Sequence, residues 1–338
     1  MRIHEYLSDQ ATRRAEAIAI QDWDGTLWSF AKEWEAAQAG AELLKQAGVQ
    51  RGDRVLMVTE NCACQCAFIF ACSLIGAWAV PVNARQTASE LSRIITHATP
   101  RLAVFMADVS PEAKAHGARL KATEAIGAWG RVLMAELGPS DPAPDPDVAV
   151  MLYATGTTGT PKGVMLTHAN LVFAGITSTK TRGMTESDIV YGALPMTHVF
   201  GLASMLMAAT FAGSVIRLEA RFTPAKLYDA LVSGVTILPA VPQMHALLMQ
   251  YTAEKGIDSI AGGPLRFVSS GAAPLDPVWK RKAEAFYGIA LQNGYGMTET
   301  TAGVCTTKSV FGDPDISVGP PLEGVEISID ERCEGGGA

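Results

Sequence analysis

The sequence predicts an α/β protein made of two lobes, each a mostly parallel β-sheet flanked by helices. Its 338 residues are enough for about two domains. Because 48% of the residues are apolar and only 18% are charged, the chain can bury a large core. Segments with helical periodicity alternate with short runs rich in valine and leucine, which is typical of parallel strands covered on both faces.

The predicted first lobe spans residues 1–147. Ser29 is a suitable N-cap for a helix with its apolar residues on one face, and Gly48 is placed to end it. The apolar run at residues 55–58 predicts a buried strand. A helix, a strand, a helix and a strand are expected to follow at residues 63–74, 78–82, 88–97 and 102–106.

A proline-rich segment predicts the boundary between the lobes. Residues 138–147 read GPSDPAPDPD, and this density of proline excludes a helix and a central strand. The predicted second lobe, residues 148–320, repeats the alternation. Its strands are expected at residues 148–153, 189–194, 214–218, 235–238 and 266–269, and its helices at residues 202–211, 224–232, 243–253 and 277–286.

Charge and cysteine content restrict the partners and the compartment. A net charge of −7 excludes sequence-independent binding of nucleic acid or acidic membrane, so a bound anion needs a local site. Residues 61–84 and 189–216 are uncharged and long enough to cross a bilayer, but polar residues, glycine and proline interrupt both, so we expect no membrane span. Six cysteines without framework spacing and an N-terminus without an apolar signal core predict free thiols and a cytoplasmic protein.

Residues 153–168, YATGTTGTPKGVMLTH, form the most informative segment. Its glycines allow close backbone approach, its threonine hydroxyls can donate to phosphate oxygens, and Lys162 supplies a positive charge. The segment differs from a P-loop, because Pro161 precedes Lys162 and residues 163–164 are expected to continue as a strand. These residue types favour a polyphosphate cradle, and a flexible hairpin rich in glycine and threonine is the alternative.

A second segment, residues 292–300, reads QNGYGMTET. Gly294 and Gly296 flank Tyr295, an aromatic ring that can stack on a base, and Thr298 and Glu299 follow. A single carboxylate near a phosphate cradle suits Mg²⁺, which takes one or two protein carboxylates and completes its shell with water and phosphate oxygens. The alternative for Glu299 is an ordinary solvated loop acid.

These two segments resemble the phosphate-binding signature and the adenine- and magnesium-binding signature of the adenylate-forming (AMP-binding) superfamily. Three further segments resemble it in order and spacing: LPMTHVFG at residues 194–201, SSGAAPL at 269–275 and SVGPPLEGVEISID at 317–330. The resemblance covers essentially the whole chain. It points to the acyl-CoA synthetase and fatty-acid–CoA ligase branch, and to the N-terminal large domain only.

The resemblance implies a role for each matching residue. Around the β- and γ-phosphates of ATP it places Thr155, Gly156, Thr157, Thr158, Gly159 and Lys162. Around adenine it places Gly271, Ala272, Ala273, Asn293, Gly294, Tyr295 and Gly296. Asn293 would bond the exocyclic amine of adenine, Thr298 would meet the α-phosphate as a catalytic residue, and Glu299 would hold Mg²⁺.

The implied reaction is attack of a substrate carboxylate on the α-phosphorus of MgATP. It gives an acyl-adenylate and pyrophosphate, and thioester formation with coenzyme A follows. Positioning and neutralisation of phosphate charge supply most of the acceleration in such a step. Relatives that activate amino acids carry an aspartate near the segment that matches residues 196–200, where this chain has no acid, so the resemblance disfavours an amino acid.

The resemblance also places His198 at the acyl entrance as a catalytic residue, and the alternative for it is a hydrogen-bonded core histidine. An apolar pocket for a fatty or aromatic acid is suggested by Val199, Phe200, Val241 and Met244. The particular acid and the oligomeric state cannot be read from the sequence.

Two other functions are open at this point: a nucleotide- or acyl-binding module without turnover, and an adenylating enzyme that loads an acyl carrier protein. We expect residues 321–338 to be only the start of a β-barrel subdomain, with its first strand at 325–329. We also expect the C-terminal domain that carries the superfamily's catalytic lysine to be absent. The chain alone would then have low ligase activity.

Overall fold

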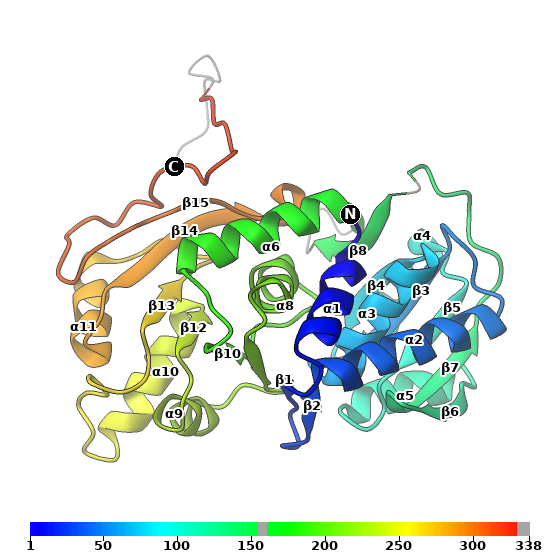
Figure 1. Cartoon of the computed structure of the whole chain (residues 1–338), viewed down its shortest axis with the longest axis horizontal. Helices are drawn as coiled ribbons and strands as arrows, with labels where there is room; N and C mark the ends of the chain where they lie inside the picture. The colour runs from blue at the N-terminus through cyan, green and yellow to red at the C-terminus, as the bar shows by residue number, and fades with distance from the viewer. Residues whose placement is uncertain (146, 155–160, 330–338) are drawn as a thin grey trace.

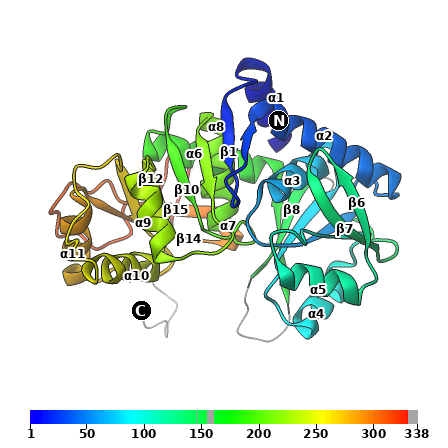
Figure 2. The same ribbon diagram turned by 90° about the horizontal axis from the view of Figure 1, so that it is seen from below.

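The computed structural model describes residues 1–145, 147–154 and 161–329. Two β-sheets lie on either side of a central layer of helices, and further helices cover the outer face of each sheet (Figure 1, Figure 2). The predicted two-sheet α/β architecture is therefore confirmed.

The first sheet has seven strands in the order β6-β7-β5-β3-β4-β8-β9. Its centre is parallel, because β3 pairs with β4 and β5, and β4 pairs with β8. The strands at both edges run antiparallel to their neighbours. The bounds are β3 Arg54–Thr59, β4 Trp78–Asn83, β5 Leu102–Phe105, β6 Thr123–Gly127, β7 Gly130–Glu136, β8 Val148–Ala154 and β9 Lys162–Thr167.

The second sheet has eight strands in the order β15-β14-β13-β12-β10-β11-β1-β2. The strands from β14 to β1 are parallel, whereas β15 and β2 are antiparallel edges. The bounds are β1 Ile18–Gln21, β2 Leu27–Ser29, β10 Ile189–Gly192, β11 Val215–Leu218, β12 Ile237–Ala240, β13 Phe267–Ser270, β14 Leu291–Met297 and β15 Ala302–Thr306.

Helices form three layers, one between the sheets and one outside each sheet. The central layer holds α1 Ile3–Arg13, α2 Phe30–Gln46, α3 Ala63–Ile75, α6 His168–Arg182, α7 Val199–Gly201, the π-helix η1 Leu202–Met207 and α8 Ala208–Ala212. The outer face of the first sheet carries α4 Ala88–Ala98 and α5 Pro111–Arg119. The outer face of the second sheet carries α9 Pro224–Val232, α10 Pro242–Ala253 and α11 Pro277–Tyr287.

Strand β3 shows why its sequence is a continuous apolar run. Val55 and Met57 pack into the central core, whereas Leu56 and Val58 pack beneath the outer helices α4 and α5. Alternate side chains of a strand point to opposite faces, and both faces are covered here. The predicted helix after Ser29 is confirmed too, since the Ser29 hydroxyl accepts a hydrogen bond from the amide of Lys32.

The sheets do not divide the chain at residue 147. Strand β8 was predicted in the second lobe, and this placement was wrong, because β8 pairs with β4 and β9 adds to it in the first sheet. Conversely, β1 and β2 near the N-terminus complete the second sheet beside β11. Apolar pattern identifies a strand, but pairing over long sequence distances decides which sheet it joins.

The predicted strand at residues 325–329 was also wrong. The structure has no strand there, and Ile329 is 85% exposed. Among the described residues, this segment finds no partner strand to take its backbone hydrogen bonds. In the part of the chain that the structure describes, no helix is long and apolar enough to cross a membrane. The five described cysteines are free thiols, as predicted.

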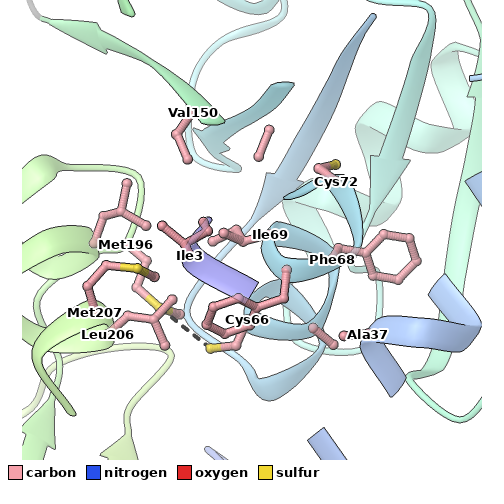
Figure 3. Packing of buried hydrophobic residues seen from close by; sticks show 14 of the residues in the cluster. Ile3, Ala37, Cys66, Phe68, Ile69, Cys72, Val150, Met196, Leu206 and Met207 are labelled. Carbon is pink, nitrogen blue, oxygen red and sulfur yellow. Dashed lines mark hydrogen bonds between the residues drawn. The ribbon is translucent and has the colours of Figure 1, made fainter. Parts of the chain in front are cut away.

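The central layer joins the two sheets through close packing of small and flexible side chains (Figure 3). Ile3 of α1 lies beside Ile69 of α3, and Cys66 of α3 lies 3.7 Å from the Met196 sulfur, measured from Sγ to Sδ. Met196 belongs to the loop between β10 and α7. The packing therefore fixes this loop of the second sheet against a helix that follows β3 of the first sheet.

Glu33 of α2 is a buried carboxyl group in this layer. It is 2% exposed, and its Oε1 has no hydrogen-bond partner among the described residues. Burial without a compensating charge raises its pKa from 4.5 to about 8. The folded protein therefore holds this group protonated at neutral pH, whereas the unfolded chain ionises it above its ordinary pKa.

We expect Glu33→Gln to remove a pH dependence of stability. Between pH 4.5 and 8 the unfolded state loses this proton and the folded state keeps it, so the free energy of unfolding falls by about 1.4 kcal/mol per pH unit as pH rises. Glutamine has no proton to lose, so urea denaturation of the variant should show a flatter profile. Glu35→Gln, an exposed position on the same helix, is the control and should keep the wild-type slope.

Candidate functional site

A cavity of about 400 Å³ lies at the carboxyl ends of strands β12, β13 and β14, beside α6 and the loop that follows β10. Carboxyl ends of neighbouring parallel strands are where open α/β sheets bind ligands. Four of the predicted segments contribute to its wall, through residues 194–195 and 198–201, 269–272, 293–298, and Leu322 of the 317–330 segment. The sequence separates these segments by up to 128 positions, and the fold brings them together.

The loop before α7 is held by Asn61, which follows β3 of the first sheet. The Asn61 amide nitrogen donates to the carbonyl oxygens of Gly192 (2.9 Å) and Leu194 (2.8 Å). Its oxygen accepts a hydrogen bond from the amide of Met196 at 2.9 Å. Asn61 is only 4% exposed, and both N–H groups and the oxygen of its side chain bond to this loop. It thus fixes the chain that leads into His198.

His198 is the N-cap residue of α7 and lies in the cavity wall. Its side chain reaches solvent, but crowding by protein atoms desolvates the ring and lowers its pKa. The ring is therefore neutral at neutral pH, with one N–H donor and one acceptor nitrogen. The core-histidine alternative does not fit, because the side chain is exposed at a cavity.

Most of the apolar residues predicted for an acyl pocket lie in the same wall. Val199, Phe200 and Val241 line the cavity. The prediction for Met244 was wrong, since Met244 is buried among α9, α10 and α11 instead. Met244 lies on α10, the helix that follows Val241, and its side chain points into the outer core. The spacing of apolar residues in the sequence does not give this direction.

The segment after β13 forms another part of the wall. Gly271 and Ala272 line the cavity, whereas Ala273 does not. A methyl group at Gly271 would lie 3.1 Å from the ring of Phe200, so glycine lets this ring approach the backbone. Ala272 has φ = +67°, a conformation that non-glycine residues rarely adopt. Residues held in such conformations cluster at ligand sites.

Asn293 lines the cavity and carries an acceptor oxygen without a partner among the described residues. It is 3% exposed and its Nδ2 donates to the carbonyl of Ser317 at 2.9 Å. Its Oδ1 is buried and has no partner among the described residues. Buried polar atoms are almost always hydrogen-bonded, so a donor from outside the protein chain, either a water molecule or a ligand group, would complete this one. An exocyclic amine of a base is such a donor.

Gly294, Tyr295 and Gly296 continue strand β14 along the cavity. A methyl group at Gly296 would lie 1.8 Å from the carbonyl oxygen of Ala302 on β15, so the tight antiparallel pairing requires glycine there. Tyr295 is 50% exposed, and its ring is available for stacking. A methyl group at Gly294 would likewise lie 2.9 Å from the carbonyl oxygen of Cys305, so both glycines have a structural reason in addition to any ligand contact.

A short 3-10 helix, η2 Thr298–Thr300, follows β14. Thr298 lines the cavity, and Glu299 is exposed just beyond the cavity wall. The described residues contain no cluster of three or more histidine, cysteine or acidic groups that could hold a metal by themselves. A lone exposed carboxylate fits Mg²⁺ that arrives with a polyphosphate, since this ion needs only one or two protein carboxylates.

Of the predicted phosphate cradle, the structure describes only Lys162. Lys162 is exposed at the start of β9, opposite Ala154 of β8, and is not part of the cavity wall. The strand predicted at residues 163–164 is confirmed as part of β9. Thr155, Gly156, Thr157, Thr158 and Gly159 lie outside the described residues.

Sequence reasoning missed the contribution of α6 to the cavity. Ser178, Thr181 and Arg182 line it from the last turn and a half of this helix. A cation at the end of a helix is expected on electrostatic grounds alone, so Arg182 carries no separate signal in the sequence.

A sequence profile described as "AMP-binding enzyme" matches residues 7–336. The chain belongs to this AMP-binding enzyme family. The adenylate-forming resemblance of the motifs is thereby confirmed.

The relatives of this AMP-binding family member include CoA ligases. The chain is 30% identical over 327 residues to a 2-succinylbenzoate–CoA ligase of Geobacillus kaustophilus. This alignment covers 96% of this chain and 64% of that protein. It is 31% identical over 316 residues to 4-coumarate–CoA ligase 5 of Oryza sativa, and this alignment covers 88% of this chain and 57% of that protein. The chain thus spans less than two thirds of the length of these relatives.

Solved structures of the family have the same fold. The o-succinylbenzoate CoA synthetase MenE of Bacillus subtilis, in complex with ATP and magnesium ion, matches with a TM-score of 0.79 and 26% identity, covering 97% of this chain and 67% of that one. Apo MatB of Rhodopseudomonas palustris matches with a TM-score of 0.77 and 28% identity, covering 96% and 65%.

Proposed function

We propose that the cavity binds MgATP and an apolar fatty or aromatic carboxylic acid and joins them as an acyl-adenylate. The observation that carries this proposal is the convergence of His198, Gly271, Asn293, Tyr295 and Thr298 on one cavity. Both the family and the ATP- and magnesium-bound relative support it. In the whole protein, we propose that coenzyme A then takes the acyl group as a thioester.

The nucleotide has a matching surface at one end of the cavity. Asn293 Oδ1 would accept a hydrogen bond from the exocyclic amine of adenine, which would satisfy this buried atom. Gly271 and Ala272 would lie on one side of the base and Tyr295 on the other. We propose that Lys162 and residues 155–159 hold the β- and γ-phosphates.

The reacting groups would meet near Thr298 and His198. A carboxylate oxygen of the acid attacks the α-phosphorus, a P–O bond forms, and the bond to the β-phosphate oxygen breaks with loss of pyrophosphate. The Thr298 hydroxyl would donate to an α-phosphate oxygen as charge develops on it. Neutral His198 would orient the carboxylate through its N–H group. Glu299 would hold Mg²⁺, whose charge offsets that of the phosphates.

Thermal-shift titration with MgATP tests the nucleotide site, because a ligand that binds the native state raises stability in proportion to RT ln(1 + [L]/Kd). We expect stabilisation by MgATP and a further shift with octanoate or an aromatic acid. Release of pyrophosphate in the presence of both substrates would show adenylate formation directly. The proposal fails if MgATP gives no shift at any concentration.

Glu299→Gln should weaken MgATP binding roughly tenfold or more with little change in the free energy of unfolding. The carboxylate is exposed and has no hydrogen-bond or ion-pair partner among the described residues, so its loss would remove a metal ligand and little else. Titration of ATP with and without magnesium measures the effect, which should vanish when magnesium is left out. Glu136→Gln, an exposed position on β7, is the control. Unfolding of the Glu299 variant would instead show that this residue is structural.

A further inference from the structure

Arg182 places a positive charge in the wall of the proposed acyl pocket. It is the last residue of α6 and lines the cavity together with Ser178 and Thr181. These three positions are spaced i, i+3 and i+4, so they share one face of the helix. The helix thus presents a polar, cationic surface to a cavity whose other walls include Val199, Phe200 and Val241.

The contacts of the guanidinium are with other residues of the cavity wall. Arg182 donates to the carbonyl oxygen of Ser204 in the π-helix η1. Its guanidinium carbon lies 5.8 Å from the centre of the Phe267 ring. Within residues 1–145, 147–154 and 161–329, this guanidinium has a carbonyl and an aromatic ring as partners but no carboxylate.

The end of α6 is held rigidly in this place. Arg266 donates to the carbonyl oxygens of Arg182 (3.0 Å) and Gly183 (2.9 Å), which would otherwise be unpaired at the helix end. Arg266 in turn forms an ion pair with Asp188 at 2.6 Å, and Asp188 is 3% exposed. A side chain on such a support is preorganised to contact a ligand.

Arg182 contacts the part of the cavity wall where strand β13 begins. Its partner Phe267 begins strand β13, and the adenine-side residue Gly271 follows the end of this strand. Since a strand rises about 3.3 Å per residue, Phe267 and Gly271 are separated by roughly 10–13 Å along this strand. The carboxylate that attacks ATP would lie near Gly271 and His198, so Arg182 would meet a different group of the substrate.

Burial makes this charge unfavourable while it is unpaired. Desolvation lowers the pKa of Arg182 to about 10, which still leaves the group cationic at neutral pH. A cation in a mostly apolar wall gains most from an anionic partner that enters with the ligand.

We propose that Arg182 recognises a second carboxylate at the far end of the acid, so that the preferred substrates are apolar dicarboxylic acids. This inference rests on the proposed function of the cavity. Ser178 and Thr181 would add hydroxyl donors to the same carboxylate. The competing explanation is that Arg182 only supports η1 through its hydrogen bond to Ser204. In that case dicarboxylic and monocarboxylic acids would bind equally well.

Calorimetric titration with pairs of acids of equal length tests this inference. The probes are adipate, suberate and sebacate against hexanoate, octanoate and decanoate, each added with and without MgATP. For the wild-type chain we expect at least one dicarboxylate to bind about tenfold or more tightly than its monocarboxylate partner. Equal binding within every pair would overturn the inference.

Variants separate recognition from support of the fold. Arg182→Gln keeps a donor for the Ser204 carbonyl but removes the charge, and it should abolish the preference for the dicarboxylate while monocarboxylate binding is retained. Arg182→Lys should keep part of the preference. Arg119→Gln, an exposed position on α5, is the control. If Arg182→Gln weakens the binding of dicarboxylates and monocarboxylates equally, Arg182 only supports the fold.

The outcome also distinguishes this inference from the proposed function. Stabilisation by MgATP and binding of monocarboxylates, without preference for a second carboxylate, would overturn the role of Arg182 alone. Absence of binding for every acid and for MgATP would overturn both.

Discussion

Asn61→Leu is expected to lower the free energy of unfolding by about 2–6 kcal/mol. The substitution leaves two buried backbone groups without partners, the carbonyl of Leu194 and the amide of Met196, whereas the Gly192 carbonyl keeps its hydrogen bond from the Glu219 amide. Each unsatisfied buried group costs about 1–3 kcal/mol. Natural domains have only about 5–15 kcal/mol of stability, so this loss is a large part of the total.

Urea denaturation measures this effect, and acid binding provides a second readout. Because Asn61 fixes the loop that carries His198, we expect the folded variant to bind carboxylic acids more weakly than the wild type. Asn170→Leu is the matched control, since Asn170 is an exposed capping residue whose loss costs about 1 kcal/mol. Equal destabilisation in the two variants would contradict the role assigned to Asn61.

The case of Asn61 shows which part of the site the sequence could predict. Motif segments such as residues 269–275 and 292–300 carry their own chemistry, and the structure places most of their residues at one cavity. Asn61 carries no such local signal, because its three partners lie 131–135 positions away in the chain. Hydrogen bonds over that separation exist only once both sheets have formed.

The fold shows the same division between local and long-range information. The helix after Ser29 follows from a cap and a periodic pattern within a few residues, and it was predicted with nearly correct bounds. The sheet that β8 joins depends on pairing of Val150 with Ala79, and the sequence order suggested the wrong sheet. Arg182 was missed for a related reason, because a cation at a helix end looks the same with or without a cavity beside it.

Asn293→Leu is expected to remove the discrimination between ATP and a purine nucleotide that lacks the exocyclic amine. In the wild type, Asn293 Oδ1 is a buried acceptor without a partner among the described residues, and the amine of adenine would supply the missing donor. Purine riboside triphosphate leaves this acceptor unsatisfied, so it should bind about tenfold more weakly than ATP. Leucine has no acceptor, and the two nucleotides should then bind alike.

The ratio of the two affinities is a better readout than either affinity alone. Asn293 also donates to the Ser317 carbonyl, so its replacement loosens the neighbouring segment and weakens both nucleotides together. Gln292→Leu is a matched control, because Gln292 bonds both the amide and the carbonyl of Ser309 but does not line the cavity. This control should lose stability yet keep the wild-type ratio. If Asn293→Leu also keeps that ratio, the buried oxygen does not recognise the base, and the adenine site must lie elsewhere in the cavity.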